Sequence, residues 1–224
     1  MIRAVIFDMD GVIIDSEPLY LGWFRKFFEE NHIFVEDEEF NQLAGCSAKM
    51  EEQLLGKWWN QSKNEHKSEK EIYALFDDFY KRYIKKNPYS YVDIKDENID
   101  NVMAWLKRNG YQIAIASSSA LDVIKYVIKE IDIEKYVDVI VSGEMFRESK
   151  PNPEIYKFTL KKLGLEAREC VAIEDSTYGI QAAKGAGITT FAKKDNRFHY
   201  NQSIADVVID DLSQIITSLN RSMS

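Results

Sequence analysis

Two acidic side chains directly follow the first apolar segment of the chain. Residues 2–7 form a nearly unbroken apolar run, which ends at Asp8 and Asp10, with Gly11 next. Carboxylates this close repel each other, and a bound cation or a proton usually relieves the repulsion. Gly11 allows the backbone to turn sharply at this point. The spacing therefore predicts a carboxylate site at the carboxyl end of a strand that is buried on both faces.

Polar side chains also follow three later apolar runs. The runs cover 111–116, 137–141 and 170–173, and the polar residues after them are Ser117, Lys150, Glu174 and Asp175. Ligands of open parallel sheets bind beyond the carboxyl ends of the strands, so these side chains are expected to meet Asp8 and Asp10 at one edge. Clustered acids favour a hard cation such as Mg²⁺, and a lysine and a hydroxyl beside it suit a phosphate.

Each of these features taken alone has a simpler explanation. Asp-x-Asp-Gly also occurs in calcium loops, although Val12 stands where the next oxygen ligand of such a loop should be. Ser117 alone could cap a helix, and Lys150 alone could be an ordinary surface lysine. The acids at 174–175 alone could favour the N-terminus of the next helix. Their combination at consecutive strand ends is what indicates a single site.

Strands and helices alternate after about residue 92. Strands are predicted at 1–8, 111–116, 137–141, 170–173, 188–192 and 205–209, and helices at 99–108, 121–128, 153–164, 178–186 and 212–219. This alternation predicts a mostly parallel sheet covered by helices. Asn152 is expected to cap the third of these helices, with Pro153 as its first residue.

Residues 16–91 have a different pattern. Aromatic and aliphatic residues recur there at helical spacing, for example Phe24, Phe27 and Phe28, and Asn87-Pro88 ends the last helix. The block predicts an all-α domain inserted after the first strand. The α/β core domain would then combine residues 1–15 with 92–224, and the segments near 14–17 and 88–92 are the expected hinges.

Composition restricts the class of protein. The chain has 224 residues, and its net charge of −8 disfavours nucleic acid and anionic membranes as partners. No window approaches the roughly 20 apolar residues of a membrane span, and Arg3 and Asp8 interrupt the N-terminal apolar run, which argues against a signal peptide. Cys46 and Cys170 have no CxxC partner and are expected to be unpaired thiols in a reducing compartment. We expect a soluble, cytoplasmic protein and, as the default for this architecture, a monomer.

Four segments in chain order resemble the motifs of the haloacid dehalogenase superfamily. They are DMDGVIIDSEP from Asp8, the single residue Ser117, SKPNPE from Ser149 and IEDSTYG from Ile173. The resemblance covers essentially the whole chain, and the ordered set of motifs is highly specific. The branch to which the chain is similar contains sugar-phosphate phosphatases and β-phosphoglucomutase. The resemblance implies a Rossmann-like core with a helical cap domain after the first strand, which would close over the site and read the leaving group.

The resemblance also implies a role for each motif residue. Asp8 would be the nucleophile that forms an aspartyl phosphate, and Asp10 would be the general acid and base. Ser117 and Lys150 would hold the transferring phosphoryl group. The implied ligands of Mg²⁺ are Asp8, the backbone carbonyl of Asp10, Glu174 and Asp175. The expected partner is a small phosphorylated metabolite, and the favoured activity is hydrolysis of a phosphomonoester such as a sugar phosphate.

A β-phosphoglucomutase-type activity is the main alternative. The mutase pattern has a histidine where this chain has Tyr20, and it has a lysine and an arginine around a glycine in its cap loop. The matching segment 43–48 has alanines at both places, although Lys49 is adjacent. A mutase must hold a second phosphate, which calls for cations in the cap. The sequence therefore favours water as the final acceptor and leaves the mutase open, because Lys49 could take over the missing lysine's role.

Substrate contacts and the remaining alternatives depend on weaker signals. The candidates for binding the substrate and its leaving group are Ser118, Glu17, Tyr20, Gly45 and Lys49. A dehalogenase is disfavoured, since its chemistry lacks the metal and the second acid that Asp10 supplies. A non-catalytic sensor of phosphorylated metabolites is also disfavoured, because it would not need a nucleophile with an acid beside it. A protein-interaction module would not need polar strand ends at all.

Overall fold

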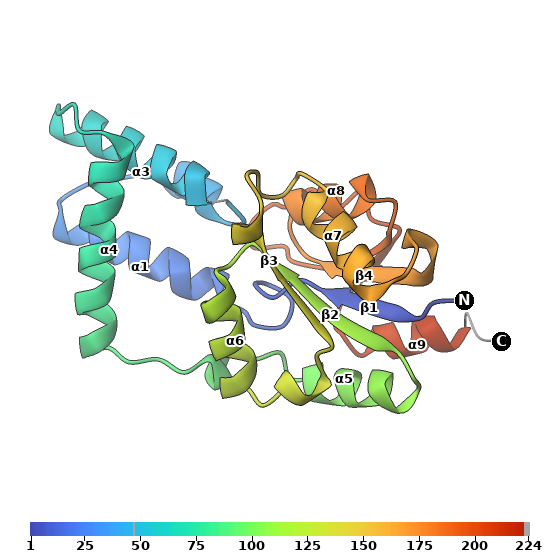
Figure 1. Cartoon of the computed structure of the whole chain (residues 1–224). Coiled ribbons are helices and arrows are strands. Elements are labelled where there is room, and N and C mark those ends of the chain that lie inside the picture. The colour runs from blue at the N-terminus through green and yellow to red at the C-terminus, as the bar shows by residue number, and fades with distance from the viewer. Residues whose placement is uncertain (47, 222–224) are drawn as a thin grey trace. The chain divides into compact units, whose positions relative to one another are not determined.

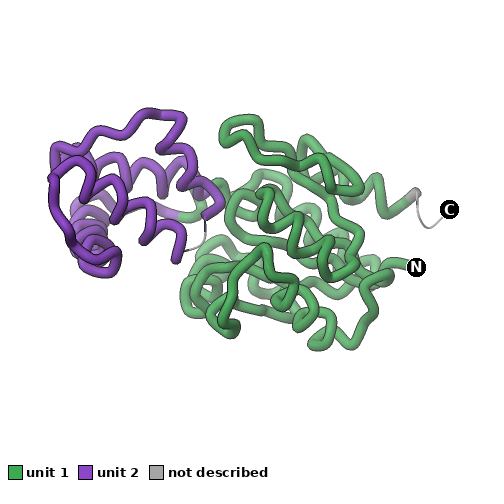
Figure 2. The backbone as a smooth tube through the Cα atoms, turned by 90° about the horizontal axis from the view of Figure 1, so that it is seen from above, with its two compact units in different colours: residues 1–15, 91–224 green, residues 16–90 purple. Residues whose placement is uncertain are grey.

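The structure divides into two compact units, which Figure 2 shows in different colours. It is a computed structural model that describes residues 1–46 and 48–221. The first unit combines residues 1–15 with 91–224, and the second unit is residues 16–90. Ser47, which belongs to the segment compared with the mutase cap loop, lies outside the described residues.

A parallel sheet forms the centre of the first unit. Among the described residues it has six strands in the order β3-β2-β1-β4-β5-β6, all paired in parallel. The strands are β1 (Ala4–Phe7), β2 (Gln112–Ser117), β3 (Val139–Ser142), β4 (Cys170–Glu174), β5 (Thr189–Lys193) and β6 (Val207–Ile209). All four residues of β1 are buried, as expected for a strand with neighbours on both sides and helices on both faces. The predicted α/β class with a Rossmann-like parallel sheet is confirmed.

Helices cover both faces of this sheet (Figure 1). Helices α7 (Glu154–Leu163) and α8 (Thr177–Gly185) lie over one face. Helices α5 (Ile99–Arg108), α6 (Leu121–Glu130) and α9 (Gln214–Arg221) lie over the other. Right-handed crossovers account for the division of α5 and α6 from α7 and α8, because the chain moves along the sheet in one direction from β1 to β3 and then returns past β1 to β4.

Side chains alternate between the two faces along each strand. Ala4 and Ile6 of β1 belong to one buried cluster together with Ala172 of β4 and with Ile155 and Tyr156 of α7. Small residues on the strands allow α7 to pack closely. This packing carries Tyr156, which is completely buried, toward the carboxyl end of the sheet.

Short 3-10 helices in the described chain are η1 (Asn41–Leu43), η2 (Tyr91–Ile94), η3 (Glu134–Tyr136), η4 (Gly143–Met145) and η5 (Ala167–Glu169).

The second unit is helical and has an aromatic core. Its α-helices are α1 (Glu17–Glu30), α2 (Asp37–Phe40), α3 (Ala48–Lys63) and α4 (Glu69–Lys86). The rings of Phe24 and Phe76 stack with their centroids 4.3 Å apart. Ser68 and Glu71 form a capping box at the start of α4, which satisfies backbone N–H groups there. The aromatic residues at helical spacing therefore form a core that belongs to this unit.

The segments on either side of the helical unit are bonded to each other. The Asp15 N–H donates to the Ile94 carbonyl at 2.7 Å, and the Asp96 N–H donates to the Ile13 carbonyl at 2.9 Å. Arg197 adds two hydrogen bonds of 2.8 Å to the Asp15 carboxylate. The first of the two predicted hinge segments is thus tied to the α/β unit up to Asp15.

Some boundaries differ from the prediction for local reasons. The α7 helix begins at Glu154, because Pro153 has φ −74° and ψ 1° and occupies the cap position itself. Asn152 still accepts a hydrogen bond from the Glu154 N–H, at 2.9 Å. The expectation that Pro153 is the first helical residue was therefore wrong by one position.

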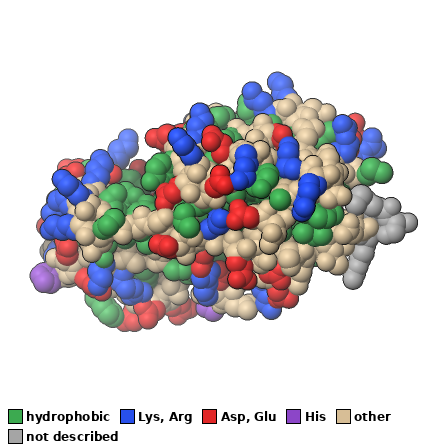
Figure 3. All heavy atoms as spheres, turned by 90° about the horizontal axis from the view of Figure 1, so that it is seen from below, with side chains coloured by type: hydrophobic (Ala, Val, Ile, Leu, Met, Phe, Trp, Pro, Cys, Tyr) green, Lys and Arg blue, Asp and Glu red, His purple; other side chains and the backbone are tan. Residues whose placement is uncertain are grey.

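Surface and thiol properties follow the composition. On the face drawn in Figure 3, Lys and Arg side chains are interspersed with Asp and Glu side chains, unlike the one-sided basic surface typical of nucleic-acid binding. In the part of the chain that the structure describes, every helix is too short or too polar to cross a membrane. Cys46 and Cys170 are unpaired, as predicted, and burial raises the pKa of both thiols to about 12.

Candidate active site

Three buried carboxylates meet at the carboxyl ends of β1 and β4. Asp8 follows β1 directly and donates its backbone N–H to Ile173 of β4 at 2.9 Å. This pairing places Asp8 beside Glu174, the last residue of β4, and Asp175 follows. Each of the three acids offers a carboxylate oxygen within 4.8 Å of the others, and all three are buried. Neighbouring parallel strands thus bring together acids that are far apart in the sequence.

Lys150 lies between two of these acids. Its Nζ is 2.9 Å from Asp8 Oδ1 and 2.7 Å from Glu174 Oε1, and it also donates to the Ala116 carbonyl at 3.0 Å. Burial alone would lower the pKa of Lys150, but the charges of Asp8 and Glu174 outweigh burial, and the pKa is raised. The lysine therefore stays charged and supplies a fixed positive charge at the nucleophile predicted from the sequence.

Tyr156 also contacts Glu174, and the sequence interpretation missed it. Its hydroxyl donates to Glu174 Oε1, the same oxygen that Lys150 contacts. Burial, followed by the charge of Glu174, raises the pKa of Tyr156 well above its usual value, so the hydroxyl keeps its proton and acts as a donor. Burial and then Asp8 raise the pKa of the Glu174 carboxyl. Tyr156 sits at an apolar position of a core helix, and nothing in the sequence pattern marks it as more than a core residue.

The other Glu174 oxygen is left without a partner among the described residues. Glu174 Oε2 is buried and makes no hydrogen bond to any residue that the structure describes. A buried carboxylate oxygen without a partner is costly, which indicates that something else binds it. A hard cation shared with Asp8 and Asp175 fits, because all the available donors are carboxylate oxygens.

Two glycines make room for the acids. A Cβ on Gly179 would lie 1.8 Å from Glu174 Oε2, and a Cβ on Gly11 would lie 2.0 Å from Asp175 Oδ2. Gly11 also has φ +77°, a conformation that other residues rarely adopt. The turn after Asp10 and the start of α8 therefore require glycine for the carboxylates to occupy their places, and the residues present fit a bound cation.

Two serines at the end of β2 and just after it contact Asp10. Ser119 Oγ donates to Asp10 Oδ2 at 2.8 Å, and the fully buried Ser117 hydroxyl lies 3.5 Å from the same oxygen. Ser118 is exposed, and its hydroxyl lies 3.2 Å from that of Ser149. The structure thus brings Asp8, Asp10, Ser117, Lys150, Glu174 and Asp175 to one edge of the sheet.

The remaining predicted substrate contacts all belong to the helical unit. Glu17, at the start of α1, accepts a hydrogen bond from the Gly45 N–H at 3.1 Å, so these two residues are neighbours. The Tyr20 ring packs with its centroid 5.1 Å from that of Trp23. Lys49 is exposed on α3. Their role in substrate recognition stays a prediction.

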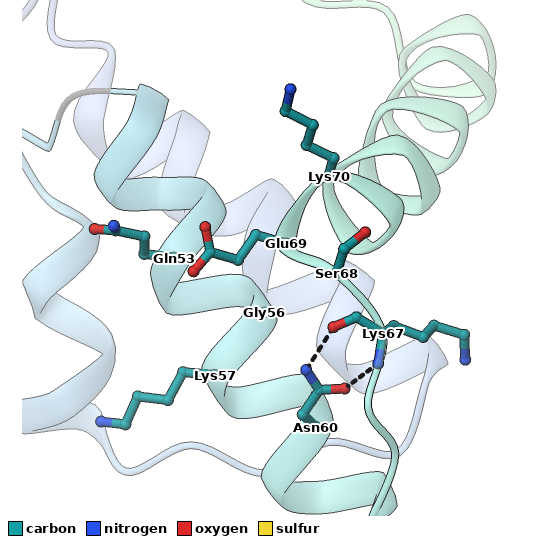
Figure 4. Close-up of a pocket in the computed structure, with 8 residues that line it drawn as sticks. All are labelled: Gln53, Gly56, Lys57, Asn60, Lys67, Ser68, Glu69 and Lys70. Carbon is teal, nitrogen blue, oxygen red and sulfur yellow. Dashed lines mark hydrogen bonds between the residues drawn. The ribbon is translucent and has the colours of Figure 1, made fainter.

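A separate hollow of about 570 Å³ lies within the helical unit, between α3 and the start of α4 (Figure 4). Asn60 exchanges two hydrogen bonds with the Lys67 backbone, at 2.8 and 3.0 Å, and so ties the two helices together there. Lys57 and Lys67 line the hollow, and each is already paired with a glutamate. The charges of this hollow are largely balanced by the protein itself, so it is a poor candidate for the active site.

Known proteins resemble this chain over most of its length. The sequence model of the haloacid dehalogenase-like hydrolase family matches residues 5–193. A phosphorylated carbohydrates phosphatase from Thermotoga maritima is 30% identical over 193 residues, which cover 83% of this chain and 82% of that protein. Hexitol phosphatase B from Escherichia coli K12 is 28% identical over an alignment of 227 residues, covering 96% of this chain and 94% of that protein.

Solved structures share the fold. The crystal structure of β-phosphoglucomutase from Clostridium difficile matches with a TM-score of 0.78, covering 100% of this chain and 99% of that chain at 22% identity. At this identity the match is a likeness of fold. Together with the family match over residues 5–193, it places the strand-end acids on a known architecture. The chain belongs to the haloacid dehalogenase-like hydrolase family.

Proposed function

We propose that this hydrolase is a Mg²⁺-dependent phosphatase that acts on a small phosphomonoester, with sugar phosphates as the favoured class. The observation that carries the proposal is the buried contact of Asp8 with Lys150, beside Glu174 and Asp175. A nucleophile, a fixed positive charge and a cation site then lie together, and Asp10 is available for proton transfer. The relatives include a phosphorylated carbohydrates phosphatase and a hexitol phosphatase, which supports this substrate class.

The proposed reaction consists of two displacements at phosphorus. A carboxylate oxygen of Asp8 attacks the phosphorus, the bond to the leaving oxygen breaks, and Asp10 protonates that oxygen. Water then attacks the phosphorus of the aspartyl phosphate and gives a proton to Asp10, while the bond to Asp8 breaks and inorganic phosphate leaves. Lys150 offsets negative charge on the transferring group, and the Ser117 hydroxyl is a further donor to it.

The acidic cluster would hold the metal. Asp8, Glu174 and Asp175, with the backbone carbonyl of Asp10, are the proposed ligands of Mg²⁺. When bound, the ion would offset the charge that develops on the phosphoryl oxygens. Support for this assignment comes from the unpartnered Glu174 Oε2 and from the two glycines that leave space for the carboxylates.

Water is the proposed final acceptor of the phosphoryl group. Tyr20 packs on Trp23, at the position where the mutase pattern has a histidine. The alanines of segment 43–48 supply no cation for a second phosphate. Recognition of the leaving group by Glu17, Tyr20, Gly45 and Lys49, a monomeric state and a cytoplasmic location remain predictions.

The decisive assay measures phosphate release from a panel of sugar phosphates with Mg²⁺, with Asp8→Asn as the blank. We expect release that Asp8→Asn abolishes and that removal of Mg²⁺ by a chelator reduces to background. Conversion of β-glucose 1-phosphate to glucose 6-phosphate on addition of a bisphosphate, with no phosphate release, would identify a mutase instead. Binding of Mg²⁺ and a sugar phosphate without any turnover would identify a sensor.

A further inference from the structure

Ser119 contacts the carboxylate that the proposed mechanism uses for proton transfer. Its hydroxyl donates to Asp10 Oδ2 at 2.8 Å, the usual length of an O–H···O hydrogen bond. The Ser117 hydroxyl lies 3.5 Å from the same oxygen, at the limit of a hydrogen bond. Ser117 was predicted from the motif, yet the shorter contact to Asp10 comes from the residue two positions later.

The loop that carries Ser119 is anchored from two strands. The Ser119 N–H donates to Ser117 Oγ at 3.0 Å, next to the end of β2. Ser142, the last residue of β3, donates its hydroxyl to the Ser119 carbonyl at 2.7 Å. Gly143 packs so closely that a Cβ there would lie 3.0 Å from Ser118 Cα. The backbone of Ser119 is therefore held by the side chains of Ser117 and Ser142, at the ends of β2 and β3.

We propose that Ser119 is a positioning residue that fixes the orientation of the Asp10 carboxylate during proton transfer. This inference rests on the proposed phosphatase activity and adds a residue to which that proposal gives no role. With Oδ2 bonded to Ser119, the Asp10 carboxylate is held in one orientation for this transfer. It gives its proton to the leaving oxygen when the P–O bond breaks, and takes one from water when the aspartyl phosphate is hydrolysed.

The physical reason is the freedom of an aspartate side chain. An unrestrained Asp10 would populate several staggered χ1 rotamers, and its carboxylate would rotate broadly about χ2. Only a fraction of these states would place an oxygen at the reacting group, and proton transfer depends on that placement. A hydrogen bond from Ser119, whose backbone is anchored, selects one of them. Loss of the bond would thus slow proton transfer more than it weakens substrate binding.

The first test compares Ser119→Ala with Ser119→Thr, which keeps a hydroxyl. For the best sugar phosphate of the panel, we expect Ser119→Ala to lower kcat about tenfold, a part of the roughly 10²–10⁴-fold that general acid–base catalysis contributes. KM should change less than twofold, and Ser119→Thr should recover most of kcat. Ser213→Ala is the matched control, because Ser213 also donates its hydroxyl to an aspartate, Asp211, before α9. Equal kcat values for Ser119→Ala and Ser213→Ala would overturn the proposal.

The second test separates the two proton transfers. p-Nitrophenolate leaves without a proton, so Ser119→Ala should still form the aspartyl phosphate from p-nitrophenyl phosphate at nearly the normal rate. Hydrolysis of the intermediate still needs Asp10, so a burst approaching one p-nitrophenolate per enzyme should precede slow turnover. A general loss of folded protein would lower burst and turnover together, which would count against a positioning role.

The third test does not depend on turnover. In crystal structures, Asp10 should adopt one conformer in the wild type and in Ser119→Thr, and two or more in Ser119→Ala. A single unchanged Asp10 conformer in Ser119→Ala would refute the positioning role even if the wild type proved inactive. Failure of the phosphatase proposal would look different from failure of the positioning role, because the wild type would then release no phosphate from any sugar phosphate of the panel.

Discussion

Tyr156 shows how one buried hydroxyl can prepare a metal ligand. Together with Lys150 it occupies Glu174 Oε1, whereas Oε2 has no hydrogen-bond partner within residues 1–46 and 48–221. Groups that orient a metal ligand typically change metal affinity by about 10–100-fold when removed. We therefore expect Tyr156→Phe to weaken Mg²⁺ binding by about tenfold or more in a calorimetric titration of metal-free protein.

The control for this prediction is a tyrosine that bonds to a glutamate elsewhere. Tyr126 is an exposed residue of α6, and its hydroxyl is hydrogen-bonded to Glu130, which raises the pKa of the phenol. Tyr126→Phe removes the same type of bond from a glutamate that is not a predicted ligand, and it should leave Mg²⁺ affinity unchanged. Equal affinities of Tyr156→Phe and wild type would show that Lys150 alone orients Glu174.

Glycine is required at position 179 because the Glu174 side chain lies against it, and not because of its backbone conformation. A Cβ at this position would lie 1.8 Å from Glu174 Oε2. We expect Gly179→Ala to displace the carboxylate, to weaken Mg²⁺ binding and to lower the free energy of unfolding by about 1–3 kcal/mol, as overpacking does. Gly22→Ala is the matched control, since a Cβ there meets nothing within 4 Å in α1 and should stabilise the protein by up to about 1 kcal/mol. Thermal unfolding measures the stability of both variants, and metal titration measures their Mg²⁺ affinity. An unaltered Mg²⁺ affinity of Gly179→Ala would contradict the prediction.

The strand-end acids could be predicted from the sequence because an apolar run that ends in carboxylates has few explanations. Asp8, Glu174 and Lys150 each follow such a run or lie in the loop after it, and parallel pairing then brings them together. Tyr156 could not be predicted in this way, because an aromatic residue at helical spacing is typical of a core. Ser119 was equally hidden, since a polar residue before a helix is usually a cap.

At the scale of elements, Asp206 links α8 to the edge of the sheet. Its carboxylate accepts two bonds from Lys184, at 2.6 and 2.7 Å, and one from the Thr190 N–H of β5 at 2.7 Å. Burial opposes ionisation, but Lys184 and the Thr190 N–H outweigh it and lower the pKa of Asp206. A lowered folded-state pKa adds stability that is present above the unfolded value of about 4 and is lost as pH falls through the folded pKa.

We therefore expect Asp206→Asn to lower the free energy of unfolding by about 1 kcal/mol at pH 7, a value reduced for the partial exposure of both side chains. The difference in the free energy of unfolding between variant and wild type should become smaller as the pH falls below about 4, because wild-type Asp206 then also loses its charge. Urea unfolding of both proteins at a series of pH values measures this difference. Asp210→Asn is the control, since Asp210 pairs with Lys194 at 3.6 Å on the surface and should contribute close to nothing. A difference that is the same at pH 3 and pH 7 would contradict the assignment.

Element types could be predicted more reliably than element ends. The predicted strand 205–209 begins in the structure only at Val207, and the side chain of the preceding Asp206 binds Lys184 and the Thr190 N–H. The predicted strand 137–141 begins at Val139, because Val137 still closes the short helix η3. Hydrophobic periodicity records which residues are buried, whereas strand ends depend on partners that are distant in the sequence.

At the scale of the whole molecule, the two units have separate hydrophobic cores. One cluster is built on the sheet around Ile6 and Tyr156, and another joins Phe27 and Phe76 of the helical unit. The predicted ligands of the cation all belong to the first unit. Three of the four tryptophans, Trp23, Trp58 and Trp59, lie in the second unit, so intrinsic fluorescence reports mainly on that unit.

Mg²⁺ should therefore stabilise the two units unequally. A ligand at 100 times its Kd stabilises the folded state that binds it by about 2.7 kcal/mol, and the acidic cluster belongs to the first unit. We expect Mg²⁺ alone to slow hydrogen exchange in peptides that cover β1 and β4, leaving exchange in α1 and α4 unchanged. The urea midpoint of tryptophan fluorescence should likewise move little with Mg²⁺. In Asp175→Asn, which removes a predicted ligand, the protection of β1 and β4 should disappear. Equal protection of α1 and β1 by Mg²⁺ would show instead that the two cores unfold as one cooperative body, because binding to one core would then stabilise both.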